Sequence, residues 1–210
     1  MGPLNPNQIA EALINGMGSY CDTTGICRQI LHLLAKGQPV AVDEIATSLQ
    51  RSRGEVARVL RQFPDVQYDD QGRIMGKGLT LSPTPHHFFV NGHTLFTWCA
   101  LDTLMYPTIL KQSARVESPC TITGTPITLT ARPDGVENVT PTDTVVSVVV
   151  PEQSEVCRNV RNAFCNHVNF FSSAEVGSTW LAERPTAFIL SINEAFQVGR
   201  ILAAKLYQER

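Results

Sequence analysis

Residues 41–63 read AVDEIATSLQRSRGEVARVLRQF. Apolar residues recur there at helical spacing in two short segments, the first with Asp43 as its expected N-cap and the second with Ser52. A tight turn separates the two segments, which is typical of a helix-turn-helix. This stretch therefore decides how the first part of the chain folds.

The flanking segments complete a winged-helix pattern. Residues 7–17 (NQIAEALINGM) and 24–37 (TGICRQILHLLAKG) also carry apolar residues at helical spacing. Residues 66–81 (VQYDDQGRIMGKGLTL) alternate around a polar turn, which predicts a β-hairpin. We therefore expect a winged-helix-like, mainly helical N-terminal domain at residues 1–80.

The rest of the chain predicts strands mixed with helices. Asn91 and Gly92 form a hairpin turn between HHFFV and HTLF, and His86, His87 and His93 are expected at the surface or beside the turn rather than as metal ligands. Further strands are expected at 114–124, 126–135 and 143–151, and helices at 97–106 (broken or kinked at Pro107), 154–171 and 192–210. The fold class is therefore α+β, with an antiparallel β-sheet and packed helices in a second domain at 81–210.

Composition excludes several classes of protein. The 210 residues contain 17 Lys and Arg against 19 Asp and Glu, a net charge of -2, so no overall basic field attracts nucleic acid or an anionic membrane. No apolar run is long enough to span a bilayer, and the first residues lack the features of a signal peptide. We therefore expect a cytoplasmic protein with no membrane partner, whose 6 cysteines are thiols.

The expected recognition helix at residues 51–63 carries four arginines, but basic and acidic side chains balance over residues 1–80. The electrostatic footprint of a DNA-binding domain is therefore missing. We expect no nucleic-acid partner and a packing role for this domain, because a fold does not fix a function.

A thiol and an acid stand close together in TWCALDTL, residues 97–104. On the expected helix, Cys99 and Asp102 share one face, because they are three positions apart. A buried carboxyl is costly unless it is paired, and this stretch contains no Lys or Arg. A core cysteine and a capping aspartate remain an alternative. If Cys165 joined them in an apolar pocket, however, two sulfurs would bind a soft metal and the acid would carry a proton.

Four blocks of the sequence resemble the bacterial organomercurial lyase (alkylmercury lyase) family: GLTLSPT at 78–84, the run from Leu95 to Thr130 around WCALD, FCNHVNFF at 164–171 and INEAFQVGR at 192–200. The resemblance covers nearly the whole chain. It implies a mercury-detoxifying enzyme that cleaves a carbon–mercury bond by protonolysis and releases a hydrocarbon and Hg(II). The family's site residues match Cys99, Asp102 and Cys165, with mercury bound as substrate and product.

The resemblance also implies no cofactor, organomercurial small molecules as substrates, small thiols for release, and mercuric reductase as the acceptor of Hg(II). Some relatives have a second cysteine where Asn166 stands, and we expect little loss from this difference. Cys120 is expected to be structural, Cys27 and Cys157 to be core or surface thiols, and Cys21 to lie in a turn. We expect a helix start at Thr97 to favour the Cys99 thiolate. A pocket-lining role is as plausible as a core role for Trp98 and Phe96.

Two other functions share some of these features. A winged-helix soft-metal sensor that binds DNA would use the N-terminal pattern and the thiols but gives Asp102 no task, and a salt-dependent shift of DNA in a gel would support it. A cysteine hydrolase would use Cys99 as an acyl nucleophile and needs a histidine base; labelling of Cys99 by an acyl probe, with ester turnover, would support that reading.

Overall fold

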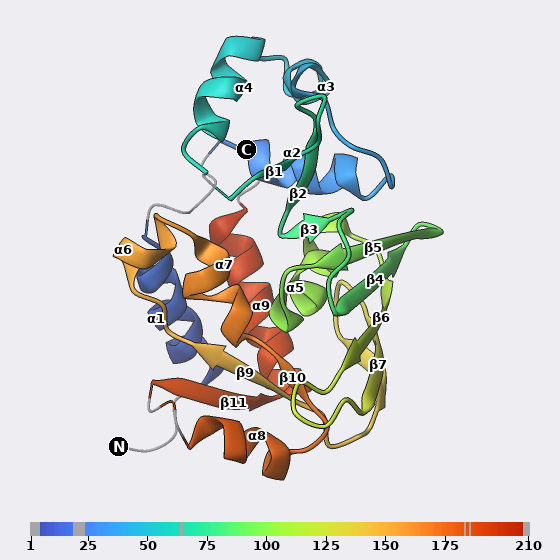
Figure 1. Cartoon of the computed structure of the whole chain (residues 1–210), viewed down its shortest axis with the longest axis vertical. Helices are drawn as coiled ribbons and strands as arrows, with labels where there is room; N and C mark the ends of the chain where they lie inside the picture. The colour runs from blue at the N-terminus through green and yellow to red at the C-terminus, as the bar shows by residue number, and fades with distance from the viewer. Residues whose placement is uncertain (1–4, 19–23, 64, 183, 185, 208–210) are drawn as a thin grey trace.

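The structure is a computed structural model that describes residues 5–18, 24–63, 65–182, 184 and 186–207. The α+β fold class is confirmed: a helical N-terminal region with a β-hairpin precedes antiparallel sheets that carry packed helices (Figure 1). Within the described residues, no helix is both long and apolar enough to span a membrane. Cys21, expected in a turn, lies outside them.

The helix-turn-helix consists of α3 (Val42–Ser48) and α4 (Arg53–Leu60), which follow α2 (Ile26–Leu34). Ser52 is confirmed as the N-cap of α4, since its side chain accepts from the Glu55 N–H while the Glu55 carboxylate accepts from the Ser52 N–H at 2.8 Å. The expected Asp43 cap is wrong. Helix α3 begins at Val42 with Ala41 as its N-cap, because the Glu44 carboxylate reaches back to the Ala41 N–H at 2.9 Å.

The hairpin of the N-terminal region continues into the main sheet. Its strands are β1 (Gln67–Tyr68) and β2 (Ile74–Lys77), and β3 (Leu79–Thr80) joins them to the rest. The sheet has the antiparallel order β1-β2-β3-β5-β4-β6-β7-β8. The remaining strands are β4 (His86–Val90), β5 (His93–Thr97), β6 (Ala114–Pro119), β7 (Pro126–Ala131) and β8 (Val136–Thr140). The expected turn at Asn91 and Gly92 is confirmed, both with positive φ.

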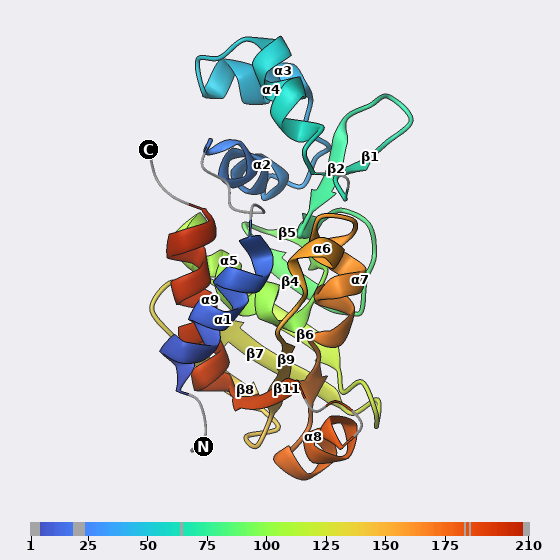
Figure 2. The same cartoon turned by 90° about the vertical axis from the view of Figure 1, so that its left-hand side faces the viewer.

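Helix α5 (Ala100–Leu110) lies at the centre of the molecule, between the main sheet and α9 (Ile192–Leu206), and α1 (Pro6–Met17) packs on α9 (Figures 1 and 2). Helix α5 is mainly apolar and is buried along its whole length except at Thr108, as expected for a helix enclosed by protein. Gly199 of α9 lets the two helices approach closely. Of the expected break or kink at Pro107, the break is wrong, because the helix continues to Leu110.

The C-terminal third differs most from expectation. The predicted strand near 143–151 is β9 (Val145–Val149), which belongs to a second sheet of order β10-β9-β11, with β10 at Phe170–Phe171 and β11 at Ala187–Ser191. The predicted helix at 154–171 is wrong, because that stretch forms α6 (Gln153–Val156), α7 (Val160–Ala163), a 3-10 turn at Cys165–His167 and then β10. Strands β8 and β11 and helix α8 (Ala174–Leu181) were not expected.

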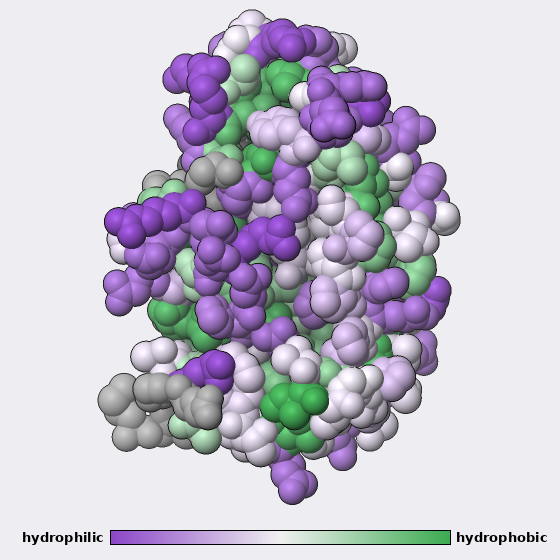
Figure 3. Space-filling view, viewed as in Figure 1, coloured by the Kyte–Doolittle hydropathy of each residue, from purple (hydrophilic) through white to green (hydrophobic). Residues whose placement is uncertain are grey.

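On the face shown in Figure 3, hydrophilic side chains cover most of the helix-turn-helix, and apolar side chains form small separate groups. His86 is an exception to its predicted position at the surface: it is buried in the sheet, with Nδ1 3.0 Å from Ser118 Oγ. Burial lowers the pKa of His86 to about 4, so the ring is neutral there.

The capping box of α4 gives a test of the helix-turn-helix. We expect Ser52→Ala to lower the free energy of unfolding by about 1 kcal/mol, because the first-turn amide of Glu55 loses its acceptor. Ser48→Ala is the matched control, since that exposed hydroxyl returns to a carbonyl of its own helix. Urea denaturation of both variants measures the difference, and equal midpoints would show that the cap contributes nothing.

Candidate active site

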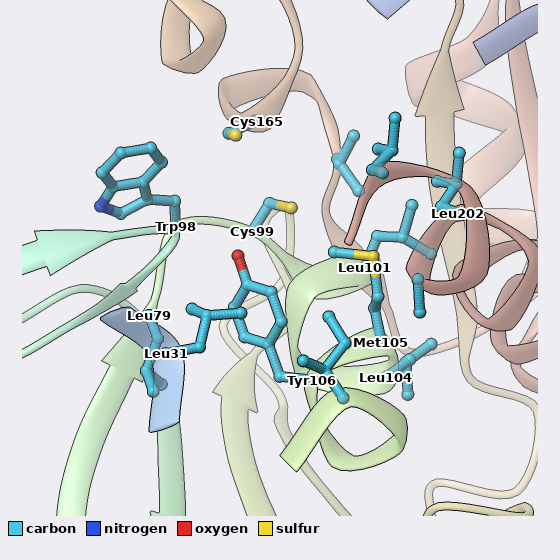
Figure 4. Close-up of a cluster of buried hydrophobic side chains, with 14 of the residues drawn as sticks. Leu31, Leu79, Trp98, Cys99, Leu101, Leu104, Met105, Tyr106, Cys165 and Leu202 are labelled. Carbon is cyan, nitrogen blue, oxygen red and sulfur yellow. The ribbon is translucent and has the colours of Figure 1, made fainter. Parts of the chain in front are cut away.

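Cys99, Asp102 and Cys165 come together at the buried end of α5. Their Sγ and carboxylate oxygen atoms all lie within 4.8 Å of one another, and all three residues are buried. Cys99 is the N-cap of α5, Asp102 lies in the first turn of that helix, and Cys165 begins the 3-10 turn that follows α7. Figure 4 shows the two cysteines approaching from opposite segments of the chain.

Backbone hydrogen bonds hold these segments together. The Ala100 N–H, at the start of α5, donates to the Val168 carbonyl just beyond the Cys165 turn at 3.1 Å. At the last residue of that turn, the His167 carbonyl accepts from the Ser147 hydroxyl of β9 at 2.8 Å. The two thiols, 66 positions apart in sequence, are therefore fixed by contacts between β9, the turn and α5.

An apolar cavity of about 50 Å³ is lined by Asp102 and Cys165 of this cluster. Its walls come from α5, α7 and α9, and from the N-terminal region through Met17, Cys27, Lys77 and Gly78. Trp98 lines the cavity, whereas the ring of Phe96 packs against His87 at 4.9 Å. The N-terminal region therefore forms part of the wall of the site.

Burial controls the protonation of the site. It raises the pKa of Asp102 to about 6, although hydrogen bonds from Cys99 and Tyr106 and the charge of Lys77 lower it. The pKa of the Cys99 thiol is raised well above its ordinary value, first by burial and then by hydrogen bonding to Cys165 and by the charge of Asp102. The expectation that a helix start at Thr97 favours the Cys99 thiolate is thus wrong, because the helix begins at Ala100 and desolvation dominates.

Two site residues escaped the sequence analysis. Tyr106 lies one turn after Asp102 on α5, so its i, i+4 spacing was a usable signal. Lys77 is a buried cation whose Nζ lies 3.7 Å from Asp65 Oδ2 and 4.8 Å from the centre of the Phe63 ring. No local pattern indicates Lys77, because it reaches the site only when the hairpin joins the sheet.

The other described cysteines lie outside the three-residue cluster. Cys120 is buried in the turn after β6, Cys157 is exposed, and Cys27 is a buried thiol in the cavity wall. Asn166 is exposed and its amide donates to Asn162 Oδ1 at 3.1 Å. A second cysteine at position 166 would therefore lie at the surface rather than in the cavity wall.

Comparisons with known proteins identify one family along nearly the whole chain. A family model described as alkylmercury lyase matches residues 79–204, and one described as the helix-turn-helix domain of alkylmercury lyase matches residues 6–78. An alkylmercury lyase of Streptomyces lividans is 47% identical over 192 residues, which cover 91% of this chain and 88% of that protein. An alkylmercury lyase of Pseudomonas putida is 43% identical over 202 residues, covering 96% and 93%.

The fold is also that of a solved structure. The crystal structure of the mercury-bound form of MerB2 matches with a TM-score of 0.72 and 24% sequence identity, and the match covers 95% of this chain and 97% of that chain.

The buried carboxyl makes stability depend on pH. The folded-state pKa of Asp102 lies near 6, above the ordinary 3.8, so the native protein binds this proton more tightly than the unfolded chain does. The carboxyl therefore lowers the free energy of unfolding as the pH rises from 3.8 to about 6. We expect the free energy of unfolding of Asp102→Asn to exceed that of the wild type by about 3 kcal/mol at pH 8. The gain should shrink towards pH 4. Denaturation curves at both pH values measure it, and a less stable variant at pH 8 would contradict it.

Proposed function

The chain belongs to the alkylmercury lyase family, and from that premise we propose that it cleaves carbon–mercury bonds by protonolysis, with Cys99 and Cys165 binding mercury and Asp102 carrying the proton. The observation that supports this best is the convergence of two thiols and one carboxyl within 4.8 Å beside an apolar cavity. A thiol pair alone would bind mercury. The acid supplies what cleavage needs in addition.

Mercury binding follows from the softness of sulfur. Thiolates bind a soft metal centre in preference to oxygen or nitrogen ligands. Two of them donate charge to mercury and weaken its bond to carbon. The organic group is apolar, and the cavity wall of Leu101, Met105, Phe164 and Leu202 suits it.

The proton then moves through Asp102. Its pKa of about 6 makes the carboxyl mostly ionised at neutral pH, whereas the Cys99 thiol keeps its proton until mercury replaces it. The substrate arrives with a small thiolate bound to its mercury. One cysteine replaces that thiolate on the metal, and the proton of the cysteine leaves with the small thiol. The second binds as its proton passes to Asp102. Asp102 delivers that proton to carbon, the electron pair of the carbon–mercury bond forms the new C–H bond, and Hg(II) stays on two thiolates.

Release of Hg(II) needs other thiols. Small thiols exchange with the two cysteines and return protons to them, and mercuric reductase is the proposed acceptor of the metal. The reaction has no redox step, because carbon gains a proton and mercury keeps both thiolate ligands. The proposed reaction therefore requires no cofactor. Detection of benzene above a solution of phenylmercury, enzyme and excess small thiol tests the function directly.

Both cysteines of the cluster should be needed. We expect Cys99→Ser and Cys165→Ser to lower the rate of benzene release by several orders of magnitude, because a neutral hydroxyl is a hard ligand and cannot replace a thiolate on mercury. Cys157→Ser, at an exposed position, is the matched control and should retain activity. Cys120→Ser should mainly reduce stability. Near-normal benzene release by Cys165→Ser would rule out the two-thiolate mechanism.

Asp102 should be needed to cleave the carbon–mercury bond but not to capture phenylmercury. Asp102→Asn leaves both thiols in place but cannot carry a proton, so we expect it to take up phenylmercury and to release benzene at least ~10² times more slowly. Intact-protein mass spectrometry should show an adduct that retains the phenyl group. Turnover close to that of the wild type would make the carboxyl a bystander, and failure to capture phenylmercury would make it part of the binding site.

A further inference from the structure

A tyrosine hydroxyl sits at the centre of the site without a role in the steps above. Tyr106 is fully buried, it lines the cavity, and its hydroxyl points towards Cys99 (Figure 4). It lies four residues after Asp102 on α5, so the two side chains share one face of the helix. Both residues line the same cavity, and Tyr106 lowers the pKa of the Asp102 carboxyl, as a hydroxyl beside an acid does.

The N-terminal hairpin provides the space for this hydroxyl. Gly78, between β2 and β3, has φ +83°, and a Cβ atom at this position would overlap the Tyr106 oxygen. The Trp98 N–H donates to the Gly78 carbonyl at 2.9 Å, which ties this backbone to the residue before Cys99. The Tyr106 hydroxyl is thus confined between the hairpin and the acid.

The Asp102 carboxyl needs a neighbouring group that holds it in position. Its Oδ2 atom is buried with no hydrogen-bond partner among the described residues. A proton donor must be held within a narrow range of distance and angle to the carbon that receives the proton, and a poorly held carboxyl loses rate even when the metal is bound correctly. A hydroxyl suits both states of the acid, because it donates to the carboxylate and accepts from the protonated form.

We propose, on the premise of the lyase reaction above, that Tyr106 is a positioning residue whose hydroxyl, confined by the Gly78 backbone, holds the Asp102 carboxyl in line with the mercury-bound carbon. Tyr106 touches neither the metal nor the leaving group in this role. It acts on proton delivery and leaves mercury capture to the cysteines. In this role, Gly78 links the N-terminal region to the chemical step.

The test is single-turnover cleavage with enzyme in excess over phenylmercury, because this measures the chemical step without Hg(II) release. Tyr106→Phe should release benzene at least about tenfold more slowly than the wild type, while phenylmercury capture, followed by intact-protein mass spectrometry, stays within about twofold. Tyr68→Phe, an exposed tyrosine on the hairpin, is the matched control and should behave as the wild type. Gly78→Ala should reproduce the slow cleavage with intact capture, because its methyl group displaces the hydroxyl.

Each outcome decides one question. Unchanged benzene release by Tyr106→Phe overturns the proposal, and so does an equal loss of capture and cleavage, which a merely structural role would produce. If Tyr106→Phe does not fold, as judged by circular dichroism, Gly78→Ala gives the same comparison. A wild-type enzyme that captures phenylmercury but releases no benzene rejects the lyase reaction itself, whereas wild-type release with a normal Tyr106→Phe variant rejects only the role of Tyr106.

Discussion

The enclosure of α5 on all sides is the constraint on which the rest of the structure depends. The main sheet covers one side of this helix and α9 covers another, with Gly199 allowing the close approach. Its first turn places Asp102 in the buried interior, and its N-cap is Cys99. The raised pKa of the acid, the protonated resting thiol and the apolar cavity all follow from that enclosure, because each reflects the cost of charge in a poorly solvated place.

This enclosure has an energetic cost that a more stable protein would avoid. An ionised carboxyl in the core opposes folding, and the neighbouring hydroxyl and cation only partly offset the effect. The same poor solvation keeps the carboxyl ready to exchange a proton near neutral pH. Stability and reactivity are therefore opposed at Asp102, as is common where strain or burial serves chemistry.

Local patterns predicted the parts of the molecule that are stabilised locally. The cap at Ser52, the turn at Asn91 and Gly92, and the pairing of Cys99 with Asp102 all depend on residues within a few positions of one another. Segments that take their form from distant partners were predicted poorly. The residues around Cys165 form short turns rather than a helix, because β9 and the start of α5 satisfy their backbone groups. The sequence offered Cys165 for the site only as a condition, and the resemblance to a known family then assigned it there. No local pattern indicated Lys77.

The position of α9 also bears on how the protein is made. This helix is close to the end of the chain, yet it packs between α1 and α5, and Leu202 and Leu206 form part of the cavity wall. On the ribosome, the segments that carry Cys99 and Cys165 emerge before α9. Until it docks, Cys99 and Cys165 lie in an unfinished pocket that is open to solvent. The nascent chain thus exposes its soft-metal ligands before it can use them, and docking of α9 turns a thiol-bearing intermediate into a closed site.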